Sequence, residues 1–234
     1  DGLIVAQLWH VGRVSHPDLL NGETPVAASA VQQAGHVSLL RPKREYVVPR
    51  ALEISEIQAI VEQYKQSAIK AKQAGFDGVE LHGANGYLID QFLQSSTNLR
   101  DDIYGGSVEN RARFLLEVVD ALIEVWGAGR VGVHLAPRGD EHDMGDANAR
   151  ETFGYVLEKL GKRQIAFFFT REYLADDSIS EYMQQRSGNV PYIANMKLSR
   201  EDAINLLETG KADAVSFGKD YLSNPDLYER LVED

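Results

Sequence analysis

Short apolar runs alternate with amphipathic segments along most of the chain, a pattern typical of parallel strands joined by helices. The predicted strands cover residues 3–9, 78–81, 131–135, 165–169, 192–194 and 213–217. Predicted helices begin near residues 55, 107, 150, 179 and 199, and a last short helix begins at Pro225. Ser55 with Gln58 fits a capping box, and Gly75 suits the left-handed position that follows a helix.

A long irregular stretch, residues 10–50, separates the first predicted strand from the first helix. We expect a small hairpin arm in it, at Val47 and Val48. Connections of this length inside compact domains are usually functional or partly structured.

The repeated strand and helix units leave two architectures, a (β/α)₈ TIM barrel and an open doubly wound sheet. No G-x-G-x-x-G motif follows the first strand, and the chain has no Walker loop, so the α/β barrel is favoured. No linker-like segment divides the units, and we therefore predict a single domain over residues 1–234. About six βα units are visible, and 234 residues fall just short of the ~250 of a typical eight-fold barrel.

Composition excludes several classes of function. The 24 basic and 35 acidic residues give a net charge of −11, whereas nucleic-acid binding needs clustered basic side chains. The absence of cysteine excludes disulfides and a thiolate nucleophile. No apolar run approaches the ~18 residues of a membrane span, and no signal peptide is visible. We expect a cytoplasmic protein with neither nucleic acid nor membrane as a partner; the sequence is silent on oligomeric state.

The densest group of candidate catalytic residues follows the second predicted strand, where the active site of a barrel is expected. His82 and Asn85 can both donate N–H groups to one oxygen, and the Tyr87 hydroxyl can supply a proton. Two donors and one acid can activate a carbonyl that is conjugated to an alkene. The alternative is an ordinary turn between strand and helix with solvated polar side chains.

Two other strand ends carry candidate binding residues. Gln7 can pair with a planar heterocycle through its amide, and Trp9 either lines a pocket or belongs to the core. The last two strand ends suit phosphate, which barrels often bind there, although a solvated Lys219 is the simpler reading. These strand ends contribute Ala194, Asn195, Met196, Gly218 and Lys219.

Metal binding is not expected. The six histidines do not pair at metal-ligand spacing. Asp140, His142 and Asp143 can in principle hold a divalent ion, but a solvated loop is the preferred interpretation.

Five segments together resemble the old yellow enzyme family of FMN-dependent ene-reductases. They read QLWHVGRVSHPD, PRALE, HGANGYLIDQFLQSSTN, DDIYGGSVENRARFLLEVVD and FGKDYLSNPDL. The resemblance implies a TIM barrel with FMN at the carboxyl ends of the strands. It also implies that NAD(P)H reduces the flavin, which then passes hydride to the β-carbon of a small activated alkene, such as an enone or nitroalkene.

The resemblance assigns a role to each candidate residue. His82 and Asn85 would bind the substrate oxygen, and Tyr87 would protonate the α-carbon. Trp9 would line the substrate pocket and Gln7 would meet the polar edge of the flavin. The remaining cofactor contacts would come from His134, Ala194, Asn195, Met196, Gly218 and Lys219.

This chain departs from the family at several cofactor positions. His134 stands where the family usually has Arg beside flavin N1, so the reduced anionic flavin should be less stabilised. ANMKL, at residues 194–198, replaces a glycine-rich phosphate loop, and Lys219 replaces an Arg. The corresponding strand of the family ends near a His, where this chain has Phe169 and Thr170.

The resemblance also implies where this chain falls short of a full barrel. The first two barrel strands of the family have no counterpart here. We therefore expect an N-terminally partial barrel. Two other functions stay open: a flavin-free barrel in which His82, Asn85 and Tyr87 isomerise double bonds by proton transfer, and a barrel remnant without catalysis.

Overall fold

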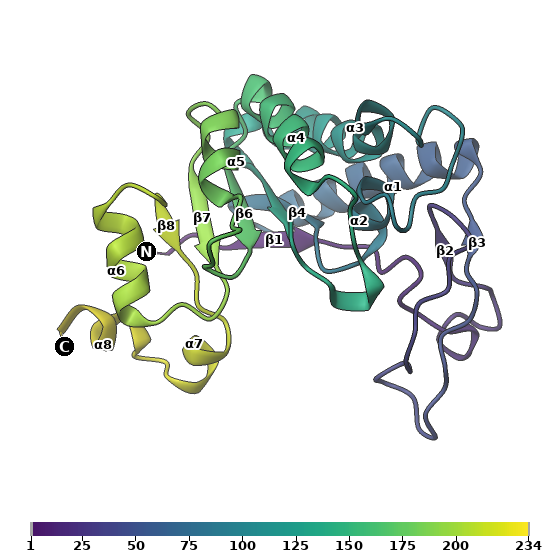
Figure 1. Ribbon diagram of the computed structural model, residues 1–234, viewed down its shortest axis with the longest axis horizontal. Coiled ribbons are helices and arrows are strands. Elements are labelled where there is room, and N and C mark those ends of the chain that lie inside the picture. The colour runs from purple at the N-terminus through teal and green to yellow at the C-terminus, as the bar shows by residue number, and fades with distance from the viewer. Residues whose placement is uncertain (1, 234) are drawn as a thin grey trace.

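The computed structural model describes residues 2–233. Within that range, six parallel strands form one sheet in the order β1-β4-β5-β6-β7-β8 (Figure 1). The strands are β1 (Val5–Leu8), β4 (Gly78–Gly83), β5 (Val131–Leu135), β6 (Phe167–Arg171), β7 (Tyr192–Asn195) and β8 (Ala214–Val215). This parallel order, with a helical segment between consecutive strands from β4 onward, matches the predicted partial (β/α)₈ barrel.

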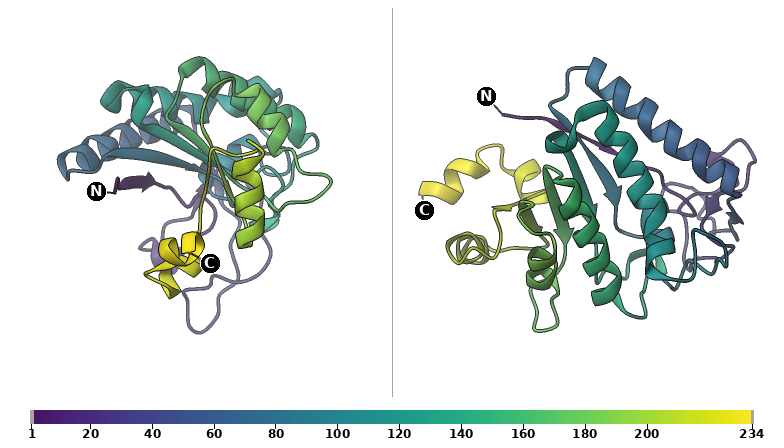
Figure 2. Two further views of the ribbon diagram at one scale, coloured as in Figure 1. Left: turned by 90° about the vertical axis from the view of Figure 1, so that its left-hand side faces the viewer. Right: turned by 90° about the horizontal axis from the view of Figure 1, so that it is seen from above.

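Four helices lie side by side over one face of the sheet (Figure 2). They are α1 (Ile54–Gln73), α3 (Val108–Trp126), α4 (Ala149–Arg163) and α5 (Ser180–Arg186). The short helix α2 (Leu88–Leu93) follows β4, and α6 (Arg200–Glu208), α7 (Lys219–Ser223) and α8 (Leu227–Glu233) accompany the β8 edge. Three 3₁₀ turns within residues 2–233 cover Pro17–Leu19, Ala128–Arg130 and Glu141–Asp143.

Alternation along the strands separates the core from the candidate site. Leu81, Val133 and Phe168 face the helices and are fully buried. The next residues along the same strands, His82 and His134 among them, point to the opposite face because strand side chains alternate. In a barrel the helices form the outer ring, so this opposite face corresponds to the barrel interior.

The first helix begins with a different capping box from the one predicted. Glu53 is the N-cap, and the Glu56 carboxylate accepts the Glu53 backbone N–H at 2.8 Å. Arg50 holds the Glu56 carboxylate with two hydrogen bonds of 2.7 and 2.8 Å, which favours this box over Ser55 with Gln58. Gly75 does adopt the left-handed conformation after the helix, with φ of +88°.

Other boundaries differ where the sequence signal is weak. The long stretch contains an isolated antiparallel bridge between His36 and Glu45 rather than an arm at Val47 and Val48. Its ends pair as the short parallel strands β2 (Val26–Ala27) and β3 (Arg50–Ala51). Most predicted strands also change their ends by one to three residues: β4 and β6 both end two residues later, and β8 keeps only two residues. The last helix begins at Leu227 instead of Pro225.

The sequence predicts that no segment spans a membrane, and the helices of the structure can be compared with this prediction. In the part of the chain that the structure describes, no helix combines the length and the apolar character needed to cross a bilayer.

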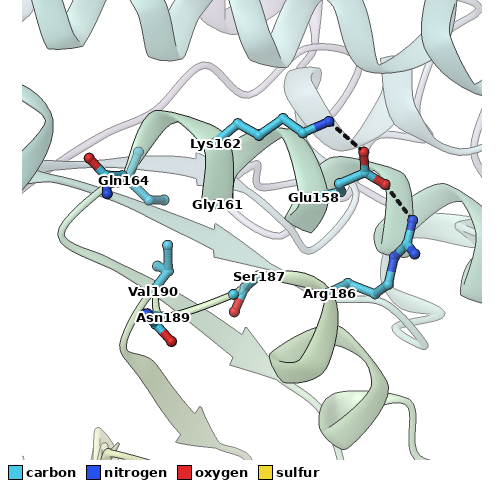
Figure 3. A pocket seen from close by; sticks show the side chains of 10 residues that line it. Glu158, Gly161, Lys162, Gln164, Arg186, Ser187, Asn189 and Val190 are labelled. Carbon is cyan, nitrogen blue, oxygen red and sulfur yellow. Dashed lines mark hydrogen bonds and ion pairs between the residues drawn. The ribbon is translucent and has the colours of Figure 1, made fainter.

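A cavity of about 450 Å³ lies between the ends of α4 and α5, before β6 and β7 begin (Figure 3). Glu158 accepts a hydrogen bond from Lys162 at 2.7 Å and also pairs with Arg186 across it. Barrel active sites lie at the opposite, carboxyl ends of the strands. This cavity is therefore separate from the candidate site. It lies at the amino ends of the strands, where barrel residues usually contribute to stability and not to catalysis.

Gly161 is needed where α4 meets the end of α5. A Cβ at this position would overlap the backbone carbonyl of Ser187, which cannot move independently of its helix end. We expect Gly161→Ala to lower the free energy of unfolding by about 1–3 kcal/mol, measured by urea denaturation. Gly129→Ala is the matched control, because no atom lies within 4 Å of its added Cβ. Equal stability of the two variants would contradict this packing argument.

Candidate active site

The turn after β4 brings together the predicted catalytic residues. Asn85 and Gly86 have φ of +56° and +76°, which reverses the chain and places Tyr87 at the start of α2. The Tyr87 ring lies 5.4 Å from the His82 ring and 4.7 Å from the Trp9 ring, centre to centre. Trp9 is 52% exposed, so it lines this site instead of filling the core.

The Asn85 side chain has a fixed orientation. Its Oδ1 accepts a hydrogen bond from Nη1 of Arg171 at 3.0 Å, and Arg171 also forms an ion pair with Glu141. The backbone carbonyl of Asn85 lies 2.8 Å from Nδ1 of His142. Because Arg171 occupies the amide oxygen, the amide NH₂ of Asn85 is the end that can donate to a ligand.

Arg171 was not predicted from the sequence, because the expected strand ended at Phe169. The strand continues to Arg171, and residues 169 and 171 share the face that carries His134. Thr170 points the other way: it is fully buried, and its Oγ1 lies 2.7 Å from the Tyr192 hydroxyl. Side chains of a strand alternate between the two faces of the sheet. Continuing this alternation for two residues beyond Phe169 would have located Arg171.

His82 and His134 form a buried pair of imidazoles. Their Nδ1 atoms are 3.1 Å apart, and among residues 2–233 neither Nε2 has a hydrogen-bond partner. Burial lowers the pKa of both rings, and for His134 the neighbouring His82 and Arg171 lower the pKa further. Both rings are therefore neutral near pH 7, so His134 does not replace the permanent charge of an Arg.

Tyr87 is suited to donate a proton. Burial raises the pKa of its hydroxyl, and the nearby Tyr46 contributes to the increase. The phenol therefore keeps its proton at neutral pH and can release it only to a strongly basic centre, such as a carbanion.

Most of the predicted cofactor-binding residues lie near the two edges of the sheet, whereas His134 lies on β5 in its middle. Gln7 on β1 donates a hydrogen bond of 2.6 Å to Glu80, and burial raises the pKa of that carboxyl. At the other edge, Asn195 donates to the backbone carbonyl of Ser216 at 2.8 Å, which joins the loops that follow β7 and β8. Ala194 lies within β7, with its side chain buried on the helix side, and the segments that follow β7 and β8 carry Met196, Gly218 and Lys219.

Asp90 anchors the turn that follows β4. Its carboxylate accepts the Gly86 N–H at 2.9 Å and the Gln94 amide at 2.8 Å. Complete burial raises the pKa of Asp90 to about 7. Since the unfolded carboxyl ionises near pH 4, Asp90 favours the unfolded state increasingly as the pH rises from 4 to 7.

Asp90→Asn should remove this pH dependence. The Asn oxygen can still accept the Gly86 N–H, and no proton is lost on unfolding. We expect the variant to gain stability relative to the parent between pH 4 and 7, by as much as about 4 kcal/mol, and the difference to stay constant above pH 7. Denaturation across this range measures it, with the exposed Asp101→Asn as control. Parallel stability curves for the parent and Asp90→Asn would exclude the raised pKa.

No group of three or more His, Asp or Glu side chains in residues 2–233 is arranged to hold a metal ion. In the cluster that follows β5, the Asp143 carboxylate instead accepts the backbone N–H of Ala34.

The fold and this geometry define a class: a βα-barrel protein with imidazole, amide and phenol groups at the carboxyl ends of its strands. Residues 1–234 match the sequence profile of the NADH:flavin oxidoreductase / NADH oxidase family. The chain belongs to this family, which confirms the resemblance to the old yellow enzymes and gives FMN as the cofactor of its class.

Among similar proteins, a flavin oxidoreductase, hxnT, of Emericella nidulans is 38% identical over 99% of this chain and 66% of its own length. A probable flavin mononucleotide-dependent alkene reductase of Leishmania infantum is 41% identical, with the same coverage. The chain thus spans about two thirds of the length of these curated relatives.

Solved structures agree with the sequence comparisons. The old yellow enzyme homologue from Zymomonas mobilis has a TM-score of 0.95 at 39% identity, covering 99% of this chain and 67% of that one. Morphinone reductase in complex with tetrahydroNAD has a TM-score of 0.91 at 42% identity, covering 98% and 65%.

Proposed function

We propose that this chain reduces activated alkenes with FMN as cofactor and NADH or NADPH as reductant. The observation that supports this most strongly is the contact among the His82, Tyr87 and Trp9 rings, with Asn85 in the turn between His82 and Tyr87. The substrate class is an enone or nitroalkene, because such molecules present an oxygen to two donors and develop carbanion character at the α-carbon.

The residues at the carboxyl ends of the strands fit FMN. The unpaired, buried Nε2 atoms of His82 and His134 need polar partners, which a bound flavin and substrate can provide. Met196 and Lys197 have φ of +129° and +51°, so the backbone turns sharply after β7 although no glycine is present. Backbone N–H groups in such a turn can approach an anion, and the exposed Lys219 adds a positive charge nearby.

We assign the cofactor contacts on this basis. Gln7 would meet the polar edge of the flavin ring and His134 its neighbouring edge. The phosphate would be held at the other edge of the sheet by Ala194, through its backbone, and by Asn195, Met196, Gly218 and Lys219. When bound, FMN supplies the redox chemistry: it accepts a hydride from NADH or NADPH and passes one to the β-carbon of the alkene.

The protein supplies orientation and electrostatics. His82 and the Asn85 amide donate to the substrate oxygen and stabilise the negative charge that develops there. The Tyr87 hydroxyl gives its proton to the α-carbon. Arg171 keeps the Asn85 amide turned with its NH₂ toward the substrate.

Absorbance spectroscopy with added FMN tests this function. We expect the protein to bind FMN, to lose the flavin absorbance when NADPH or NADH is added without oxygen, and to regain it when 2-cyclohexenone follows. Protein that binds no FMN would contradict the proposal. Bound, reducible FMN that no enone reoxidises would contradict the alkene substrate alone.

A further inference from the structure

One peptide unit in the turn that follows β4 determines where Asn85 and Tyr87 lie. The Tyr87 N–H donates to the Ala84 carbonyl at 3.3 Å, which closes residues 84–87 into a β-turn. Asn85 and Gly86 form the centre of this turn, and both have the positive φ that a type I′ turn requires. The peptide between them follows the Asn85 side chain directly and leads on to Tyr87.

Two side chains hold this peptide from opposite directions. Its N–H, on Gly86, donates to the Asp90 carboxylate at 2.9 Å, and its carbonyl, on Asn85, lies 2.8 Å from Nδ1 of His142. The N–H and the C=O of a planar trans peptide point away from each other. Asp90 follows the turn directly in the chain, whereas His142 comes from the 3₁₀ turn after β5. The contact with His142 therefore fixes the turn relative to a neighbouring strand.

The direction of the bond from His142 is determined by its partner. A carbonyl oxygen only accepts hydrogen bonds, so Nδ1 of His142 carries the hydrogen and donates it. This holds for the neutral and for the protonated imidazole. The same ring packs against the Tyr87 ring, with 5.2 Å between the two centres. His142 thus contacts both the backbone of Asn85 and the side chain of Tyr87.

The 3₁₀ turn is closely fitted to this peptide. A Cβ added to Gly86 would come within 2.7 Å of the Glu141 carbonyl oxygen and 2.8 Å of the His142 Cβ. His142 itself has φ of +58° and ψ of +37°, a left-handed conformation that is costly for a residue with a Cβ. The buried Arg13 donates to the His142 carbonyl at 2.6 Å and so supports this conformation. Backbone strain that the surroundings maintain in this way is typical of functional sites.

We propose that His142 is a positioning residue that donates its Nδ1–H to the Asn85 carbonyl and thereby holds the Asn85 amide and the Tyr87 hydroxyl at the substrate. This inference rests on the proposed function for its purpose, since the groups that His142 places are the proposed hydrogen donors. It also gives His142 a role different from the metal ligand that the sequence allows.

Nuclear magnetic resonance of the ¹⁵N-histidine-labelled full chain locates the hydrogen on His142. At pH 7 we expect Nδ1 of His142 to be protonated, both with FMN bound and after its removal. The loss of the signal in His142→Asn assigns it. An Nδ1 without a hydrogen would overturn the proposal. The measurement needs no alkene and no turnover, so a failure of the proposed reductase activity leaves its result intact.

Three substitutions of His142 separate the donor from the ring and from the backbone strain. His142→Asn places an amide nitrogen where Nδ1 stands and tolerates left-handed φ. His142→Phe keeps a ring against Tyr87 but cannot donate, and His142→Gly removes the donor while it relieves the strain. We expect the Gly86 N–H to exchange with solvent about tenfold faster in the Phe and Gly variants and at nearly the parent rate in the Asn variant. The Val133 amide in β5 is the internal control and should exchange alike in all of them.

Reoxidation of the reduced flavin by 2-cyclohexenone shows whether this restraint serves the substrate. We expect it to slow by about tenfold in the Phe and Gly variants and to stay near the parent rate in the Asn variant. Reduction of the flavin by NADPH should be unchanged in all three. Equal exchange of the Gly86 N–H in the Asn and Phe variants would refute the bond, and unequal exchange with equal reoxidation would refute its purpose at the substrate. If the Phe variant does not fold, the comparison of Asn with Gly still decides.

Discussion

Replacing Tyr87 with Phe is expected to slow alkene reduction by about 10²–10⁴-fold, because the α-carbon loses its proton donor. Reduction of the flavin by NADPH should stay near the parent rate, since no proton from Tyr87 is needed in that step. The Phe ring can keep the contacts with Trp9 and His82, so the loss isolates the hydroxyl. Stopped-flow measurement of the two half-reactions separates the effects.

Tyr228→Phe is the matched control for this experiment. It removes the same hydroxyl from a residue that is 73% exposed on α8. The control should leave both half-reactions unchanged. Equal rates of alkene reduction in Tyr87→Phe and the parent would assign the proton to water or to another group.

Asn85→Asp is expected to lower the rate of alkene reduction by about 10²–10³-fold. The carboxylate has the shape of the amide and can keep the bond to Arg171, but it cannot donate a hydrogen to the substrate oxygen. It also places negative charge where negative charge develops in the reaction. The rate constant for reoxidation of the reduced flavin by 2-cyclohexenone measures the loss.

Asn21→Asp makes the same change at a comparable backbone conformation. Asn21 has φ of +52°, against +56° at Asn85, but it is exposed in the irregular stretch far along the chain from the turn. The control should retain the parent rate. Equal losses in the two variants would indicate damage to the fold, and equal retention would mean that Asn85 does not bind the substrate oxygen.

The sequence predicts the end of a strand or helix well only where apolar residues give way sharply to polar or turn-forming residues. Residues 131–135 were predicted without error because a short apolar run lies between Gly129-Arg130 on one side and Pro137 on the other. The end of β6 was missed because Thr170 and Arg171 are polar, and only their alternate facing shows that the strand continues. The α1 capping box was misplaced because it depends on Arg50, which is in contact only after folding.

The candidate site was predictable in its types of residue and not in its orientations. Proximity in the chain was enough to group His82, Asn85 and Tyr87. The contacts that orient them come from later strands: His134 is 52 residues and Arg171 is 86 residues away from its partner. Pairings over such distances depend on strand order and register, which one sequence does not reveal.

The 3₁₀ turn Glu141–Asp143 gives the site an unexpected thermodynamic character. It is tied to the turn after β4 through His142, to β6 through Glu141, and to the irregular stretch through the bond from Arg13 to the His142 carbonyl. Proteins open locally in contiguous cooperative units, and these three hydrogen-bonded and ion-paired segments form one such unit. Exposure of the irregular stretch and release of the Asn85 amide should therefore be a single cooperative fluctuation, with one free energy governing both.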